Sequence, residues 1–236
     1  MCKIIALIPC YNEEKNISAV VQGIREHAFA YHIDYLIIND CSTDHTLQIC
    51  RENGYHYLDL PVNLGIGGGM QAGYMYAWQR GYDIAIQHDG DGQHDPGGFD
   101  DVIAPLVAGE ADIVIGSRFM AEDGYKATGW RRLGIAFLSG LIKLCTGLKI
   151  HDVTSGFRAA NRRYIEFFAE HYAQDYPEPE AIMDAALGKA KIVEIPVVMH
   201  ERKEGKSSID ALGSLYYMIK VSVAIIMHRF IAPRKG

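Results

Sequence analysis

Short apolar runs alternate with helical patterns along the first half of the chain. Residues 3–8 and 84–87 are apolar runs bounded by polar residues, which is typical of strands buried in a sheet. A helix-start signal, Ser42-Thr43-Asp44, follows one such run. Alternation at this spacing predicts an α/β fold with a single Rossmann-like, mostly parallel sheet and helices on both faces. The other predicted strands here are residues 35–38, 55–60 and 112–115, and the helices are about 12–27, 67–80 and 96–108.

The alternation changes after about residue 117, and longer helical stretches follow. We expect one domain over residues 1–236, whose last part is a long apolar helix within residues 209–236. The predicted elements are a helix over 133–150, a strand or loop over 154–160, a helix over 180–189, a strand over 192–199 and a helix over 211–231.

Composition narrows the class of protein. The 236 residues are 49% hydrophobic and 22% charged, which is ordinary for a globular domain. A net charge of −6 and the lack of a basic, aromatic stripe argue against a nucleic-acid partner. None of the five cysteines forms a Cys-x-x-Cys pair, so we expect a reducing compartment without disulfides or a zinc site. The chain enters its first strand without signal-peptide features, which predicts a cytoplasmic protein.

The most informative local feature is Asp89-Gly90-Asp91, directly after the strand at 84–87. Open α/β sheets bind ligands at the carboxyl edge of their strands. Two carboxylates there suit a hard divalent cation, which in turn suits a diphosphate. A plain Asp/Gly turn is the alternative. A calcium loop is a weaker one, because it requires glycine where His94 stands and a helix before the loop.

Three other segments carry polar or glycine-rich signals at predicted sheet edges. They are residues 9–14, residues 39–44 and the glycine-rich residues 65–69. Together with the aspartate pair they predict one composite site. The glycine-rich segment is no Walker loop, because no Gly-Lys-Ser/Thr follows it. Its glycines, Gly67 among them, allow either close approach to a ligand or tight packing of helix on sheet.

Three motifs give the chain its resemblance to a known family: Asp89-Gly-Asp-Gly-Gln-His94, Asp152-Val-Thr-Ser-Gly-Phe-Arg158, and Arg202 with Gly205, Lys206 and Ser207. Over most of its length it resembles the inverting nucleotide-sugar glycosyltransferases with the glycosyltransferase A fold, and in particular the branch that moves sugars onto polyprenyl phosphates, such as dolichol-phosphate mannosyltransferases. It departs from that branch at Ile66, where a basic residue is frequent, and at Ser208, where lysine is common.

The resemblance implies a nucleotide-binding half at 1–117 and an acceptor half at 118–208. It also implies that the donor is a UDP- or GDP-sugar. Asp40 would accept a hydrogen bond from the N–H edge of the base, which both uracil and guanine have. The alternative for Glu14 is a solvent-exposed acid in the first turn of a helix, without ligand contact. The alternative for Asp40 is to cap the N-terminus of a helix. Asp89 and Asp91 would bind Mg²⁺ or Mn²⁺, with Gln93 as a third oxygen ligand. The implied donor-binding residues are Pro9, Tyr11, Glu14, Asp40, Gly67 and Asp89.

On the acceptor side, the resemblance implies that Arg158, Arg202 and Lys206 bind the phosphate of a polyprenyl phosphate. That phosphate is already largely ionised at neutral pH and needs no general base. A hydroxyl acceptor would need a carboxylate base, and Glu180 is the first candidate. The alternative for Glu180 is a structural role as an acid at the start of a helix. The catalytic candidates, in an enzyme of cell-surface glycan synthesis, are Asp91, Arg158, Arg202 and Glu180.

Two further classes of function stay open at this point. A sugar nucleotidyltransferase would carry a basic, glycine-rich loop after its first strand, whereas residues 9–14 are acidic and free of glycine. A non-catalytic nucleotide-binding subunit is the other class, and the intact aspartate pair argues against it.

The C-terminal helix has the length of a membrane span, about 20 residues. Lys220 in its middle opposes crossing. A less apolar stripe runs through it, so we expect it to lie in the membrane interface, with the helix at 133–150 as a second such element. Packing on the core or in a homo-oligomer interface is the alternative. The stripe consists of Ser214, Tyr217, Lys220 and Ala224.

Overall fold

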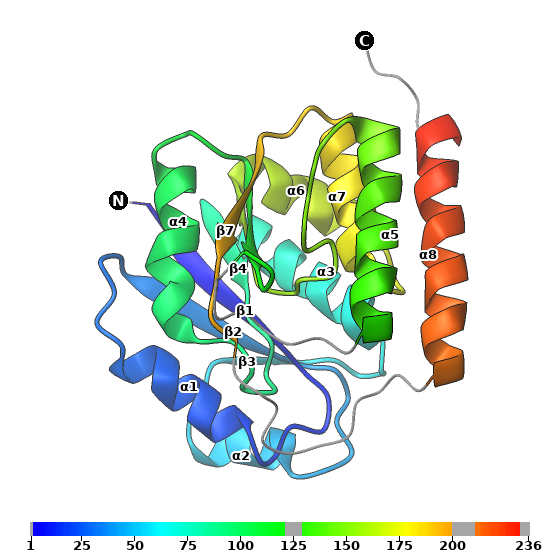
Figure 1. The fold of residues 1–236 in the computed structure, drawn as a ribbon. Helices are drawn as coiled ribbons and strands as arrows, with labels where there is room; N and C mark the ends of the chain where they lie inside the picture. Colours follow the sequence, from blue (N-terminus) through cyan, green and yellow to red (C-terminus); the bar gives the residue numbers. More distant parts are fainter. Residues whose placement is uncertain (1, 121–128, 200–210, 232–236) are drawn as a thin grey trace.

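A seven-stranded sheet forms the centre of the protein in the computed structural model, which describes residues 2–120, 129–199 and 211–231 (Figure 1). The strand order is β3-β2-β1-β4-β6-β5-β7, and β6 is antiparallel to both of its neighbours while the other pairs are parallel. The carboxyl ends of six strands therefore share one edge with the start of β6. The strands are β1 (Ile4–Cys10), β2 (Ile33–Asn39), β3 (Tyr57–Asp59), β4 (Ile84–Gln87), β5 (Ile113–Ser117), β6 (Arg158–Asn161) and β7 (Ile192–Pro196).

Helices cover both faces of the sheet because the central strands are apolar on both sides. In β1, Ile5 and Leu7 pack on the face that carries α3, α5, α6, α7 and α8, whereas Ile4, Ala6 and Ile8 pack on the face that carries α1, α2 and α4. The helices are α1 (Ile17–Glu26), α2 (Thr46–Glu52), α3 (Gly65–Gln79), α4 (Phe99–Val107), α5 (Gly129–Thr146), α6 (Arg162–Glu170), α7 (Pro177–Leu187) and α8 (Ala211–Ile231), with a 3₁₀ turn at Pro96–Gly98.

The predicted α/β class and mostly parallel sheet are confirmed, with two additions. The stretch at 154–160, left open between strand and loop, ends in β6, which inserts antiparallel between β4 and β5. The helix α6, which the sequence analysis did not include, buries Tyr164, Ile165 and Phe168 against α3 and the sheet. Its buried residues Tyr164, Ile165, Phe168 and Ala169 recur at helical spacing, a signal that the sequence analysis missed.

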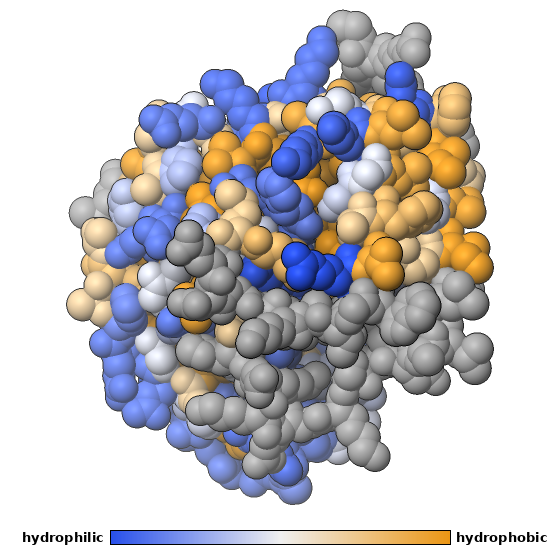
Figure 2. Space-filling model, in the orientation of Figure 1, coloured by the Kyte–Doolittle hydropathy of each residue, from blue (hydrophilic) through white to orange (hydrophobic). Residues whose placement is uncertain are grey.

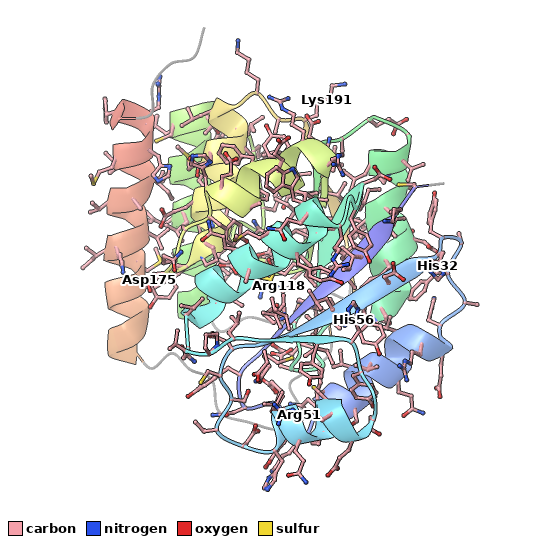
Figure 3. All side chains as sticks on the ribbon, turned by 180° about the vertical axis from the view of Figure 1, so that it is seen from behind. His32, Arg51, His56, Arg118, Asp175 and Lys191 are labelled. Atoms are coloured by element: carbon pink, nitrogen blue, oxygen red, sulfur yellow. The ribbon has the colours of Figure 1, made fainter. Side chains whose placement is uncertain are left out.

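The helix α8 lies beside α5 and α7 at one side of the molecule (Figure 1). Val221 and Ile225 of α8 are buried in the core, and two polar side chains have partners in the protein: Lys220 pairs with Asp175 before α7, and His228 binds Asp184 of α7. Figure 3 shows Asp175 next to α8 from behind. The apolar side chains Ile219 and Phe230 are 59% and 82% exposed. The side of α8 that faces the protein thus includes the apolar residues Val221 and Ile225, the described part of the less apolar stripe is partly buried, and an apolar stripe faces outward.

Candidate active site

The loop after β4 packs closely on the end of β1. A Cβ atom on Gly90 would lie 2.4 Å from the Cys10 Sγ and 3.0 Å from the Pro9 carbonyl oxygen, so only glycine fits there. The Gly90 main-chain N–H donates to that same oxygen, at 3.3 Å. This contact holds Asp89 and Asp91 on either side of a fixed point at the carboxyl edge of the sheet.

Asp89 lies against the second predicted motif. A Cβ atom on Gly156 would come within 2.8 Å of Asp89 Oδ2, and Gln87 Nε2 lies 3.5 Å from Asp89 Oδ1. The antiparallel direction of β6 causes this, because it brings Arg158 opposite Gln87 in the sheet register. Two motifs that lie far apart in the sequence therefore meet at one point.

The oxygen atoms of this loop fit a hard divalent cation. Asp91 Oδ1 accepts the main-chain N–H of Gln93 at 3.0 Å, which orders the turn, and Asp89 is about one-third exposed. Within the described residues, no group of three or more His, Cys, Asp or Glu side chains is placed to bind a metal. A donor set of this kind suits Mg²⁺, which is usually bound by one or two carboxylates together with substrate phosphates and water. Asp89, Asp91 and Gln93 remain the predicted metal ligands.

Asp40 joins the end of β2 to the start of α3. It is 5% exposed, and its Oδ1 accepts the main-chain N–H of Leu64 at 2.7 Å. Its carbonyl oxygen accepts from Asn63 Nδ2 at 3.2 Å. Leu64 is the N-cap residue of α3, so Asp40 stabilises the start of that helix, not that of α2. Contact between Asp40 and a nucleotide base stays a prediction.

The segments after β1 and β2 are joined to each other by side chains. Asn12, at φ +58°, accepts the Thr43 main-chain N–H through Oδ1 at 2.8 Å. Glu14 Oε2 accepts the main-chain N–H of His45 at 3.0 Å and lies 2.8 Å from its Nδ1. These hydrogen bonds lower the pKa of Glu14. Glu14 therefore shapes the wall of the predicted donor pocket, where Tyr11 is about half exposed.

The first turn of α3 packs on the main chain before α7. A Cβ atom on Gly67 would lie 2.0 Å from the Ala173 carbonyl oxygen and 2.2 Å from that of Gln174. Packing is thus sufficient reason for glycine at this position. Of the two interpretations that the sequence left open, the structure supports packing, and donor contact by Gly67 stays a prediction.

Arg158 is buried, although the resemblance implied a phosphate-binding role. It is 2% exposed, and its guanidinium donates to the Ser155 carbonyl oxygen at 2.6 Å and 3.1 Å and to that of Glu178 at 3.2 Å. These bonds hold the 152–158 motif against the start of α7. Burial argues against direct contact between Arg158 and an acceptor phosphate, and phosphate binding by Arg158 stays a prediction.

Glu178 is the acidic residue of α7 that lies near the aspartate motif. Burial raises its pKa, which Arg158 lowers and Asp89 raises further. Glu180, the first candidate for a base, lies instead 3.3 Å from His228 Nε2 of α8. Residues two apart on a helix point in nearly opposite directions. Glu180 and Asp184 are four residues apart and so lie on one face of the helix. This spacing is a sequence signal that Glu180 faces a different way from Glu178.

The sequence analysis missed a buried ion pair between Arg118, at the end of β5, and Asp152. Arg118 Nε and Nη2 each donate to the Asp152 carboxylate at 2.7 Å, and Nη2 also donates to Thr154 Oγ1 at 2.7 Å. The Asp152 main-chain N–H donates to Glu194 Oε1 of β7 at 2.9 Å. This pair joins β5, the 152–158 motif and β7 beneath the site (Arg118 is labelled in Figure 3).

Two predicted acceptor residues, Arg202 and Lys206, lie outside the described residues. The side chains that the structure does bring to this edge are those of Asp40, Asp89, Asp91 and Gln93, with Glu178 close to Asp89. The part of the predicted site that is described is therefore the donor and metal side.

A mixed sheet with one antiparallel strand, and with an aspartate pair at its carboxyl edge, defines this protein as one with the glycosyltransferase A fold. Solved structures share that architecture. Glucosyl-3-phosphoglycerate synthase from Mycobacterium tuberculosis, in complex with phosphoglyceric acid, matches with a TM-score of 0.73 and 19% identity over 100% of this chain and 82% of that one. Another structure of that enzyme, with Mn²⁺, uridine diphosphate and glucosyl-3-phosphoglycerate, has a TM-score of 0.72 at 20% identity, with the same coverage.

The sequence profile of glycosyl transferase family 2 matches residues 5–168, and the chain belongs to this family of glycosyltransferases. The polyprenol monophosphomannose synthase of Mycolicibacterium smegmatis is 27% identical over 92% of this chain and 85% of its own length. The undecaprenyl-phosphate mannosyltransferase of Micrococcus luteus is 29% identical, with 88% of both chains covered. A UDP-N-acetylglucosamine–dolichyl-phosphate N-acetylglucosaminyltransferase of Methanococcus voltae is 29% identical over 82% of this chain and 84% of its own. The family resemblance deduced from the motifs is confirmed.

Proposed function

We propose that this protein transfers a sugar, with inversion, from a nucleotide diphosphate sugar to a polyprenyl phosphate at the cytoplasmic surface of a membrane. The observation that carries the proposal is the contact between Asp89 and Gly156, which joins the aspartate motif to the 152–158 motif at one sheet edge. Three relatives that are similar over more than four-fifths of this chain are named as transferases to lipid phosphates of the polyprenyl type.

Asp89 and Asp91 would hold Mg²⁺ or Mn²⁺, with Gln93 as a further oxygen ligand. When bound, the metal neutralises the diphosphate leaving group as a Lewis acid. Asp40 and Tyr11 bind the nucleoside of a UDP- or GDP-sugar at the adjoining strand ends, with Pro9 and Glu14 in the pocket wall. Arg158 keeps the main chain beside Asp89 in place through its bonds to Ser155 and Glu178.

The acceptor needs orientation more than activation. A polyprenyl phosphate has a second pKa of about 6 and is largely dianionic at neutral pH. Its oxygen attacks the anomeric carbon from the side opposite the nucleotide; the new O–C bond forms as the bond from carbon to the diphosphate oxygen breaks. Arg202 and Lys206 supply positive charge to the acceptor phosphate, since arginine and lysine are the residues that bind phosphates.

A hydroxyl acceptor is the second candidate, and Glu178 favours it. Burial raises the pKa of this carboxyl group, which lies close to Asp89, and a raised carboxyl pKa suits a general base. In that reaction Glu178 takes the hydroxyl proton while the oxygen attacks the sugar. Glu180 is not proposed for this role, because it faces His228 on α8.

The membrane surface enters the proposal through the outward face of α5 and α8, which we call the α5–α8 face. Figure 2 shows hydrophobic residues gathered on this side of the molecule. None of the helices in the described ranges has the length and apolar character that a membrane span requires. Arg132, Lys143 and Lys149 lie beside the face and suit anionic headgroups. The exposed apolar residues are Leu133, Phe137, Leu144, Ile219, Val223, Ile226, Met227 and Phe230.

Product analysis tests the proposal. The purified chain is incubated with labelled UDP- and GDP-sugars, Mg²⁺ or Mn²⁺, and either a polyprenyl phosphate or the matching polyprenol. We expect label in a lipid-linked sugar phosphate with the phosphate acceptor only, and loss of that product in excess chelator. A glycoside formed from the polyprenol, with loss of activity in Glu178→Gln, would support the hydroxyl acceptor instead.

A further inference from the structure

His94 ends the aspartate motif, but the proposed reaction gives it no role. The residue is 4% exposed, and its ring lies 5.2 Å from that of Phe157 and 5.5 Å from that of His88. Burying a polar ring among aromatic side chains is costly unless its nitrogen atoms find partners. The partners of the His94 ring therefore show what this residue does.

Both ring nitrogens of His94 face Asp89. The Asp89 main-chain N–H donates to His94 Nδ1 at 3.0 Å, so Nδ1 is the unprotonated nitrogen. The proton of the neutral ring is then on Nε2, which lies 3.7 Å from Asp89 Oδ2. This second distance is longer than a hydrogen bond but joins a donor to a carboxylate oxygen. One imidazole thus holds the main chain of Asp89 and faces its carboxylate.

The main chain of His94 contacts the residues that follow β7. It forms an isolated antiparallel bridge with Met199. Met199 directly precedes the segment that carries Arg202 and Lys206 in the sequence. Phe157, on which the His94 ring packs, belongs to the 152–158 motif. His94 therefore connects the aspartate motif to the 152–158 motif and to Met199.

We propose that His94 is a positioning residue that sets the orientation of the Asp89 carboxylate toward the divalent cation and the donor diphosphate. The inference rests on the proposed function. His94 is no metal ligand in this arrangement, because Nδ1 already accepts from Asp89 and only 1% of the side chain is exposed. Residues that orient metal ligands in this way change metal affinity or activity by about 10- to 100-fold when they are replaced.

The test compares His94→Phe with the matched control His88→Phe. Phenylalanine fills the aromatic site but has no nitrogen atom to hold Asp89. The His88 ring belongs to the same buried cluster and contacts His94, Phe99 and Phe157. The measurements are the dissociation constant of Mn²⁺ at saturating UDP or GDP, and the melting temperature without ligands.

For His94→Phe we expect a rise of about tenfold or more in the Mn²⁺ dissociation constant and a lower kcat, with smaller changes in nucleotide affinity measured without metal. His88→Phe should keep the wild-type Mn²⁺ dissociation constant. His94→Asn places an amide oxygen near the position of Nδ1 and should recover part of the metal affinity. It also serves as the test if the phenylalanine variant does not fold.

Wild-type Mn²⁺ affinity in His94→Phe, or equal losses in both phenylalanine variants, would overturn the inference and leave the proposed function standing. A wild-type protein that binds neither UDP nor GDP with Mn²⁺ would instead contradict the proposed function itself. The two failures are therefore distinguishable from the same set of titrations.

Discussion

At the scale of single residues, the charged groups of this protein divide by burial and not by their position in motifs. Asp91 and Asp89 are partly exposed at the sheet edge, where a ligand can reach them. Arg118, Asp152 and Arg158 are instead buried, and each forms hydrogen bonds within the protein. A buried charge must be paired, and such pairs define the shape of a site without contacting the substrate. The two groups should therefore respond to substitution in different ways.

Asp91→Asn is expected to abolish turnover, by more than about 100-fold, and to leave the fold intact. The substitution removes a negative charge from a hard cation but keeps an oxygen that can accept the Gln93 N–H. Sugar transfer and circular dichroism check this result. Asp101→Asn, on an exposed acid of α4, is the control and should keep activity. A fully active Asp91→Asn protein would contradict the metal-dependent mechanism.

Asp152→Ala is expected to lower the free energy of unfolding by about 3–5 kcal/mol, because it leaves the buried Arg118 guanidinium without its partner. Urea titration measures the change. Asp175→Ala is the matched control, since Asp175 also pairs with a cation but its side chain is 63% exposed. It should cost at most about 1 kcal/mol. Equal losses in both variants would show that the Arg118–Asp152 pair has no special weight.

At the scale of elements, α7 connects the site to the outer helices. Its first turn places Glu178 near Asp89 and Arg158, while Glu180 of the same turn and Asp184 one turn later bind His228 of α8. These contacts explain how α8 can present an apolar surface outward: its polar residues have partners within the protein. The docking of α8 should consequently depend on the charge of His228.

Hydrogen bonds to Asp184 and Glu180 raise the pKa of His228 to about 10, from 6.5. A histidine whose pKa is higher in the folded than in the unfolded protein stabilises the folded state. This stabilisation is complete below pH 6.5 and is lost as the pH rises toward 10. His228→Gln should therefore be less stable than wild type at pH 6, with a difference that shrinks by pH 10. Urea midpoints of both proteins across this range measure it, with His32→Gln, an exposed histidine, as control. A constant difference between wild type and His228→Gln would contradict the ion-pair explanation.

At the scale of the whole molecule, the chemistry and the apolar surface occupy different parts of the protein. The carboxylates gather at the carboxyl edge of the sheet, and the α5–α8 face covers one side. Exposed apolar patches of this kind mark interaction surfaces. Basic residues beside the face favour an anionic lipid surface over a second copy of the chain.

Val223→Glu combined with Phe230→Glu should reduce binding to anionic liposomes by about tenfold or more at low salt, because both side chains are exposed on α8. Flotation measures the bound fraction. Val107→Glu, at the end of α4 on the opposite face of the sheet, is the control for added negative charge. If the wild-type chain does not float and the double variant instead converts a dimer to a monomer, the α5–α8 face is an oligomer interface.

The sequence by itself determined those features that depend on neighbouring residues. Apolar runs bounded by polar residues identified the parallel strands, and the helix at 211–231 was found with its bounds, because hydrophobic periodicity is a local property. The position of Asp89 and Asp91 at a sheet edge also followed from a strand that ends in Asp-Gly-Asp. A parallel sheet brings such strand ends together without any further information.

Only the tertiary structure decided what depends on chain direction and on distant partners. The antiparallel insertion of β6 buries Arg158 and brings Gly156 against Asp89. The pairing of Glu180 with α8 leaves Glu178 as the acid near the site. The outward apolar face of α8 depends likewise on its partners in α7 and the segment before it. Each of these features is a contact between residues far apart in the sequence, and no local pattern of residues encodes such a contact.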